Sequence, residues 1–178
     1  MDKKIKKIIL TALFAALVVV GSRIYIGTHD TIRFHLGNSM CLLAAFTLGP
    51  LGGGIASGLG SFIFDLLFYS QGGFILAIVT LVTKFIMGYV TGLIYNNTKI
   101  LILSGIVGEA VYIVLYVIKT YVERKVVLGM SYEAVMPIIF AKFGASVVNA
   151  IIAIIISFIV FKGMQKTFEN MNLYGDND

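Results

Sequence analysis

The sequence predicts an all-α integral membrane protein, a bundle of six transmembrane helices forming a single domain over residues 1–178. Composition is the first reason: 58% of the 178 residues are hydrophobic and 13% are charged, about half the charge of a typical soluble domain. The second reason is that the apolar residues form runs long enough to cross a bilayer. The third is that lysines cluster at the ends of these runs, which favours membrane topology over a nucleic-acid-binding surface.

Six apolar stretches meet the length requirement of a spanning helix. Pro50 and the glycines of "LGPLGGG" predict a tight turn between the second and the third. The polar "NNTK" at 96–99 ends the fourth, and Gly129 interrupts the longest connection, 123–136. The expected spans cover approximately 7–26, 36–50, 52–70, 74–95, 100–122 and 137–162.

The distribution of basic residues predicts the orientation. With six spans, both termini lie on one side of the membrane. The loops of the opposite side carry only Arg33, Arg124 and Lys125. Because cytoplasmic loops are richer in lysine and arginine, we expect a multi-pass protein of the cell membrane with both termini in the cytoplasm. The side of the termini carries Lys3, Lys4, Lys6, Lys7, Lys99, Lys162 and Lys166.

Three consecutive predicted spans each carry a polar stripe. Lys84 lies near the middle of the fourth span, where a lysine costs about 2.5–3.5 kcal/mol. Lipid would penalise all three stripes, so we expect them to turn inward. Read at steps of three and four residues, the stripes are Thr80, Lys84, Met87 and Thr91; Glu109, Tyr112, Tyr116 and Lys119; and Lys142, Ser146 and Asn149.

The depths of these residues predict a cavity that opens to the outside. Lys84, Glu109 and Asn149 fall near mid-membrane, at its floor, and Tyr116, Lys119 and Lys142 fall in the outer half. Lys84 can pair with Glu109, which reduces the cost of burying either charge. The alternative is that this pair only fixes the register of two helices. We favour a ligand pocket, because hydroxyl, amide and aromatic groups extend the stripes beyond the pair.

Other motifs are weak or point to packing. The run "GPLGGGIASGLGS" lacks the Lys-Ser/Thr and the preceding strand of a phosphate loop, and its Gly54 and Gly58 indicate close helix packing. The single Cys41 cannot form an intramolecular disulfide. His29 and His35 lie in an outer loop, where solvated or capping roles are expected. With no catalytic triad, HExxH motif or metal-spaced cluster, we expect neither an enzyme nor a bound metal or cofactor.

The first helix has a face of small residues. Its opening, "MDKKIKKIILTALFAALVVVGSR", is like a signal peptide, but we expect it to be retained because further spans of the same kind follow. Ala12 and Ala16, four residues apart, form a smooth groove for another helix. From these residues alone, that helix could belong to a partner or to this chain's own bundle.

Two segments resemble a known family. "HLGNSMCLLAAFTLGPLGGGIASGLGSFIFDLL", followed by "TLVTKFIMGYVTGLI", resembles the substrate-binding S components of energy-coupling factor (ECF) vitamin transporters, and is most similar to the riboflavin-type branch. The resemblance extends over residues 8–162. Asn38 stands where many relatives carry aspartate, a difference that concerns the substrate more than the family.

The resemblance implies a six-helix S component with an outward-facing pocket. It also implies docking onto a transmembrane coupling subunit driven by two cytoplasmic ATPases, and the family's alanine motif matches Ala12 and Ala16. The first outer loop, "IGTHDTIRFH", would then be a gate over the pocket, with His29, Asp30 and Arg33 as its polar residues.

We therefore expect a membrane subunit that captures a small, water-soluble, heteroaromatic vitamin or precursor. Riboflavin is the first candidate, and a pyridoxine-like or hydroxymethylpyrimidine-like compound is the alternative. A stand-alone ion-coupled transporter is a rival reading, but it would show paired repeats with broken helices, which the sequence lacks. The residues expected to bind the substrate are Lys84, Glu109, Tyr112, Tyr116, Lys142, Ser146 and Asn149.

Overall fold

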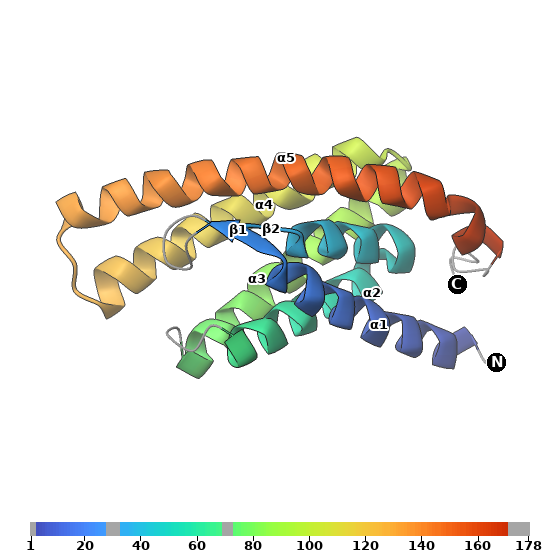
Figure 1. Cartoon of the computed structure of the whole chain (residues 1–178), viewed down its shortest axis with the longest axis horizontal. Helices are drawn as coiled ribbons and strands as arrows, with labels where there is room; N and C mark the ends of the chain where they lie inside the picture. Colours follow the sequence, from blue (N-terminus) through green and yellow to red (C-terminus); the bar gives the residue numbers. More distant parts are fainter. Residues whose placement is uncertain (1–2, 28–32, 69–72, 171–178) are drawn as a thin grey trace.

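The computed structural model describes residues 3–27, 33–68 and 73–170, and it confirms an all-helical membrane protein (Figure 1). Within these residues, five helices are long and apolar enough to cross a membrane. A six-residue π-helical segment, η2 (Val122–Val127), continues α4. The five helices are α1 (Lys3–Arg23), α2 (Gly37–Phe68), α3 (Gly73–Thr98), α4 (Leu101–Tyr121) and α5 (Tyr132–Asn170).

Helix α2 contains both stretches that the sequence predicted as the second and third spans. It bends sharply at Gly49, whose φ of 74° and ψ of −167° lie outside the helical region and suit a residue without a Cβ atom. Pro50 follows the bend, as the sequence suggested. The two arms then run back against each other, with the Ser57 hydroxyl donating to the Cys41 carbonyl at 3.5 Å. Two expected spans are thus joined as one bent helix.

A short β-hairpin connects α1 to α2. Strand β1 (Tyr25–Gly27) pairs antiparallel with β2 (Arg33–His35). The sequence predicted the end of the first span at Tyr25 and Ile26 and an outer loop over 27–35, so the hairpin corrects both. Strands of three residues are too short to show an alternating hydrophobic pattern. His29 and Asp30, two of the expected gate residues, lie outside the described residues.

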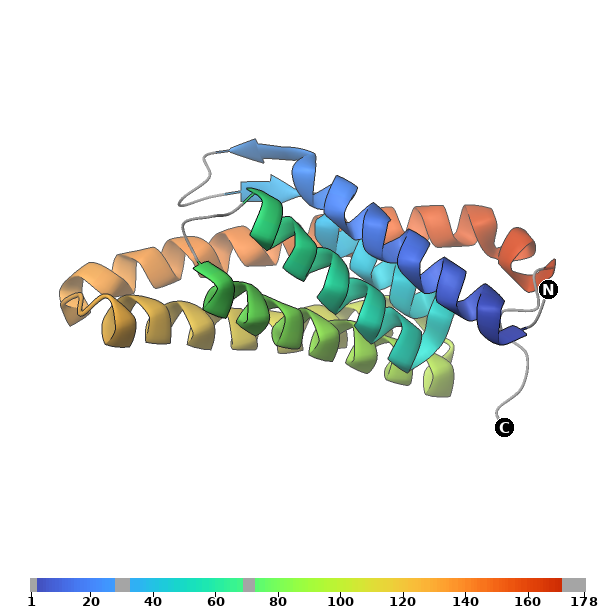
Figure 2. The ribbon, with the colours of Figure 1, turned by 90° about the horizontal axis from the view of Figure 1, so that it is seen from below.

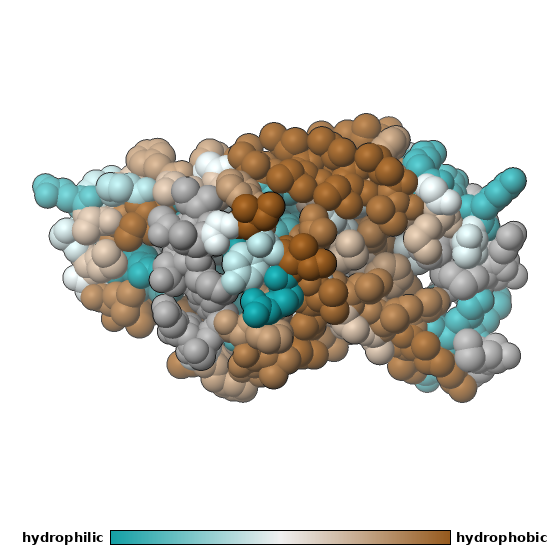
Figure 3. Space-filling view, viewed as in Figure 1, coloured by the Kyte–Doolittle hydropathy of each residue, from teal (hydrophilic) through white to brown (hydrophobic). Residues whose placement is uncertain are grey.

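The ends of the bundle differ in character. Helix α1 begins and α5 ends at the same end, as Figures 1 and 2 show from two directions. In Figure 3, hydrophobic residues dominate the middle of the face and hydrophilic residues gather at both ends. Large exposed apolar side chains such as Ile75, Ile151 and Ile159 are stable against lipid and would be unfavourable in water.

The end of the bundle nearer the termini is filled by side chains. The rings of Phe46, Tyr95 and Phe161 contact one another, with centroids 5.3–5.6 Å apart. Leu42 and Met87 are fully buried in the same cluster. This core holds α2, α3 and α5 together, and the polar stripes meet at the opposite end.

Glycines let α2 and α3 approach closely. A side chain at Gly54 would meet the Phe85 ring, and one at Gly58 would meet the Leu81 carbonyl oxygen at 2.9 Å. The pair at 54 and 58 therefore serves helix packing, as its spacing indicated.

Candidate substrate-binding site

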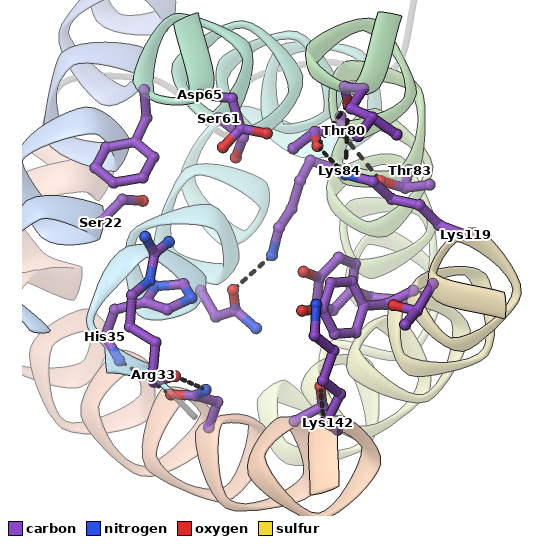
Figure 4. Close-up of a pocket in the computed structure, with 18 of the residues that line it drawn as sticks. Ser22, Arg33, His35, Ser61, Asp65, Thr80, Thr83, Lys84, Lys119 and Lys142 are labelled. Carbon is purple, nitrogen blue, oxygen red and sulfur yellow. Dashed lines mark hydrogen bonds between the residues drawn. The ribbon is translucent and has the colours of Figure 1, made fainter. Parts of the chain in front are cut away.

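A polar cavity lies at the end of the bundle opposite the termini (Figure 4). It is lined by the last turn of α1, strand β2, both ends of α2, the first half of α3, the second half of α4 and the first half of α5. Residues far apart in the sequence thus converge on one space. The polar and charged lining comprises Ser22, Arg33, His35, Asn38, Ser61, Asp65, Thr80, Thr83, Lys84, Tyr112, Tyr116, Lys119, Thr120, Glu123, Lys142, Ser146 and Asn149.

Asn38 links the two charges that the sequence predicted to pair directly. The Lys84 ammonium donates to Asn38 Oδ1 at 2.5 Å, and Asn38 Nδ2 donates to Glu109 Oε2 at 2.9 Å. These three side chains are at most 4% exposed. The amide can do this because it carries an acceptor and a donor on one short side chain. Glu109 lies behind Asn38 and not on the cavity surface, so its effect on the cavity passes through the amide.

Two tyrosines and two lysines form a column beside the cavity. Tyr112 and Tyr116, one turn apart on α4, stack with centroids 5.7 Å apart and planes 26° apart. The Lys84 ammonium lies 3.4 Å from the Tyr112 ring centroid, and that of Lys142 lies 5.6 Å from the Tyr116 centroid. Such cation–π contacts stabilise a buried ammonium. The column brings together four of the residues that the sequence proposed.

On α5, Asn149 holds strand β2 in place. Its Oδ1 accepts the His35 backbone N–H at 3.0 Å, and its Nδ2 donates to the Arg33 carbonyl at 2.8 Å. One turn earlier, the Ser146 hydroxyl donates to the carbonyl of Lys142 at 2.8 Å. Asn149 therefore lines the cavity, but its amide bonds go to the hairpin backbone.

Strand β2 contributes a neutral histidine and a cation. His35 Nδ1 accepts the Gly37 N–H at 3.1 Å, so the ring hydrogen is on Nε2. Burial, and then the neighbouring Arg33 and Lys84 charges, lower the pKa of His35 to about 3. The Arg33 guanidinium lies 4.8 Å from the Phe64 ring centroid. The strand thus offers the cavity one uncharged N–H donor and one cation.

Helices α2, α3 and α4 supply further polar groups that the sequence did not single out for binding. The Lys119 ammonium donates to Thr80 Oγ1 at 2.6 Å. Asp65 and Ser61, at the end of α2, face the same cavity (Figure 4). Asp65 could have been found by the signal that revealed Lys84, a charged side chain inside a predicted span. Gly54 and Gly58, on the same helical face two to three turns earlier, indicated a packing face instead.

A second candidate site lies on the outside of α1. Ala12 and Ala16 are exposed, whereas Phe14, Ala15 and Val18 on the same helix are buried against the bundle. The groove at Ala12 and Ala16 is therefore free of the chain's own described helices. The exposure of Ala12 and Ala16 favours a groove for a partner's helix over packing against a helix of this chain.

The chemistry of the cavity is that of reversible binding. It offers ammonium, guanidinium, imidazole, hydroxyl and carboxylate groups together with the rings of Phe64, Tyr112 and Tyr116. In the described parts of the chain, no three His, Cys, Asp or Glu side chains gather closely enough to hold a metal ion. An all-helical membrane bundle with an internal polar cavity of this kind defines a membrane-embedded solute-binding protein.

The particular family follows from comparison with known proteins. The family model described as "ECF-type riboflavin transporter, S component" matches residues 2–166, so the chain belongs to this family. It is an S component of an ECF transporter, a multi-pass membrane protein that binds substrate and is not an enzyme. The resemblance noted in the sequence is thereby confirmed.

Comparison with solved structures agrees on the fold. A chain from the structure described as "Structure and mechanism of the S component of a bacterial ECF transporter" superposes with a TM-score of 0.65 at 18% identity. The similarity covers 93% of this chain and 98% of that one. At this identity the likeness concerns the fold alone. No curated protein matches the chain.

Proposed function

We propose that this S component captures riboflavin from outside the cell in the cavity between β2, α2, α3, α4 and α5. The observation that carries the proposal is the stacked pair Tyr112 and Tyr116 beside a ring of hydrogen-bond donors. A flavin presents a flat ring system whose edge carries carbonyl oxygens and ring nitrogens. The tyrosine pair offers apolar ring surface beside which the flavin can pack, and the ammonium groups of Lys84 and Lys142 suit the acceptors at its edge.

Each expected binding residue takes a role in this proposal. Tyr112, Tyr116, Lys84, Lys142 and Ser146 contact the ligand directly, because they line the cavity. The remaining two expected residues position others. Glu109 orients the amide that receives the lysine, and Asn149 fixes strand β2 at the cavity wall.

The size of the cavity favours one alternative ligand. Its volume is about 140 Å³, below the roughly 300–1,000 Å³ of pockets that enclose drug-sized ligands. A three-ring flavin therefore requires long side chains such as Arg33 and Lys142 to swing aside. A single-ring compound such as pyridoxine, or a hydroxymethylpyrimidine, needs less rearrangement and is the second candidate.

We further propose six membrane crossings with both termini in the cytoplasm. In this reading the two arms of α2 on either side of Gly49 are separate spans, and residues 1–178 form one membrane domain. The reversal at Gly49 supports this, since α1 begins and α5 ends at the same end of the bundle. Lysines 3, 4, 6 and 7 at that end favour the cytoplasm. The cavity then opens outward.

Transport itself is proposed to require partners in the membrane. Docking of a transmembrane coupling subunit onto Ala12 and Ala16, with two cytoplasmic ATPases beneath it, would couple ligand release to ATP hydrolysis. The exposure of both alanines supports this assignment. A stand-alone ion-coupled transporter would instead take up the vitamin in cells that lack the ATPase subunits.

Ligand identification tests the proposed function. The protein is purified in mild detergent, the co-purifying small molecules are identified by mass spectrometry, and the ligand-free protein is titrated with riboflavin. We expect one riboflavin per chain and quenching of flavin fluorescence by the stacked tyrosines. The second candidate would instead be established if pyridoxine co-purified with the protein and the protein did not quench the fluorescence of added riboflavin.

A further inference from the structure

The end of the bundle nearer the termini is rich in lysine. Among the residues that the structure describes, this end has no aspartate or glutamate side chain. Near the termini the sequence adds Asp2, Glu169, Asp176 and Asp178, so positive charge still prevails there. Such an excess attracts anionic partners. The lysines of this end are Lys3, Lys4, Lys6, Lys7, Lys99, Lys162 and Lys166.

The first turns of α1 are not buried against the rest of the bundle. No residue from Lys3 to Leu13 is buried, and Ile5, Ile8 and Ile9 are 50–61% exposed. Four lysines share this segment with the isoleucines. A lysine can lay its stem along apolar surface and extend its ammonium group to the polar boundary of a membrane. This part of α1 therefore suits both acyl chains and lipid headgroups.

A second group of lysines lies where α3 and α5 meet. The ammonium of Lys99, which lies between α3 and α4, is 5.7 Å from the centroid of the Tyr95 ring. That ring contacts Phe161, which precedes Lys162 on α5. Both lysines are exposed, and the Lys162 ammonium donates to the neutral Oε1 of Gln165 at 3.4 Å. Two segments far apart in the sequence thus bring exposed ammonium groups to one side of the bundle.

The partner that fits this surface has an apolar part and an anionic part. Ile100, Ile159 and Met164, close to the two lysines in sequence, are 43–62% exposed. In Figure 3, the hydrophilic residues of this end border the hydrophobic band. A soluble phosphate would complement the lysines alone, and a zwitterionic lipid would bring acyl chains without net negative charge. An anionic phospholipid complements both the lysines and the apolar side chains.

We propose that the end of the bundle nearer the termini binds anionic phospholipids, with headgroups at Lys99 and Lys162 and acyl chains along the exposed apolar side chains of α4 and α5. The lysines of residues 3–7 extend the same positive surface along α1. This lipid site is separate from the polar cavity. It is independent of the vitamin that the cavity binds.

Lipid retention by the whole chain tests the proposal. The protein in mild detergent is mixed with phosphatidylglycerol or phosphatidylcholine of identical acyl chains, and retained lipids are counted by native mass spectrometry. We expect a preference for phosphatidylglycerol of at least about tenfold, because each of the two lysines near an anionic headgroup contributes about fivefold. High salt should weaken the preference, since the lysines are exposed. Inorganic phosphate at the same concentration should not displace the lipid.

Charge-removing variants locate the lipid site. Lys99→Asn with Lys162→Gln should abolish the preference for phosphatidylglycerol. Asparagine suits position 99 because its φ of 57° lies in the left-handed region, which asparagine tolerates. Lys125→Gln removes one lysine from the opposite end of the bundle and should keep the preference of the parent. If the double variant melts below the parent, Lys162→Gln alone should still reduce the preference about fivefold.

Equal retention of the two lipids by the parent protein overturns the proposal. A preference that survives in the double variant overturns the assignment to Lys99 and Lys162. An equal loss in Lys125→Gln overturns it as well, because the attraction would then follow net charge alone. Displacement of the lipid by inorganic phosphate would show that the lysines bind free phosphate. The riboflavin titration is a separate measurement, so neither result decides the other.

Discussion

Replacing Asn38 by leucine should strongly destabilise the protein, although the two side chains have similar volumes. The substitution leaves the Lys84 ammonium without its acceptor and Glu109 Oε2 without its donor, and all three residues are buried. Both lost hydrogen bonds involve charged groups, each contributing about 1.5–3 kcal/mol. The expected loss in free energy of unfolding is therefore about 3–6 kcal/mol, close to the cost of breaking a buried ion pair.

The single cysteine provides the assay. Cys41 is fully buried, so a thiol-reactive fluorescent dye reports its exposure as the protein melts in detergent. For a chain of this size, about 1 kcal/mol shifts the melting temperature by about 2–4 °C, so Asn38→Leu should melt at least about 6 °C lower. Thr47→Val is the matched control on the same arm of α2, because the buried Thr47 hydroxyl has no hydrogen-bond partner among the residues that the structure describes. It should melt close to the parent protein.

Removing the whole network should restore much of the stability. In the triple variant Lys84→Met, Asn38→Leu and Glu109→Leu, apolar groups replace every member of the network. Replacing all members of a buried ion pair by apolar residues of similar volume often changes the free energy of unfolding very little. A triple variant no more stable than Asn38→Leu would refute the reasoning, as would an Asn38→Leu protein that melts with the control. Titration then separates two roles. Poor ligand binding by the stable triple variant assigns the cavity-lining members of the network, Lys84 and Asn38, to the ligand, and normal binding assigns the network to the fold.

Three further predictions concern the docking groove, strand β2 and pH. Ala16→Trp should leave riboflavin binding by the isolated protein intact but abolish ATP-driven uptake; loss of folded protein would mean that the groove packs internally. Asn149→Leu removes both bonds that hold β2 to α5, so amide exchange at residues 33–35 and ligand dissociation should both accelerate, and unchanged exchange would contradict that role. His35 has a folded pKa of about 3, below its ordinary value, so the unfolded chain takes up the proton first as pH falls. Its contribution to stability is complete above about pH 6.5 and declines toward pH 3. The melting temperature should fall over that range, less steeply in His35→Gln; an equal slope in both proteins would exclude His35 as the cause.

Hydrophobic runs predicted the all-helical membrane class, and charged interruptions predicted much of the cavity lining, although the expected spans 36–50 and 52–70 lie in one bent helix. Lys84 stood out because a lysine inside a spanning helix needs a reason. Steps of three and four residues then placed Tyr112, Tyr116, Lys142 and Ser146 on inward faces, and all four line the cavity. These inferences concern one helix at a time, and helical periodicity determines them.

Contacts between distant segments could not be predicted in this way. Asn38 meets a carboxylate 71 residues away, and Asn149 meets the backbone of β2 at a separation of 114 and 116 residues. No periodicity in the sequence specifies such partners. The direct Lys84–Glu109 contact was expected because opposite charges were the only signal available. Asn38, the amide that links them, was noted as a departure from the family pattern, but nothing in its own segment indicated that it bonds Lys84 and Glu109.

The ring cluster of Phe46, Tyr95 and Phe161 has a consequence for the permeability of the membrane. The three rings contact one another and fill the bundle at the end nearer the termini. Water and ions that enter the polar cavity therefore meet a layer of packed aromatic rings before they reach the other end of the bundle. A cell can carry many copies of such a protein without dissipating its proton or sodium gradient. The cavity is thus closed by side chains at its inner end, and a ligand can leave through the end nearer the termini only if the packing of these rings changes.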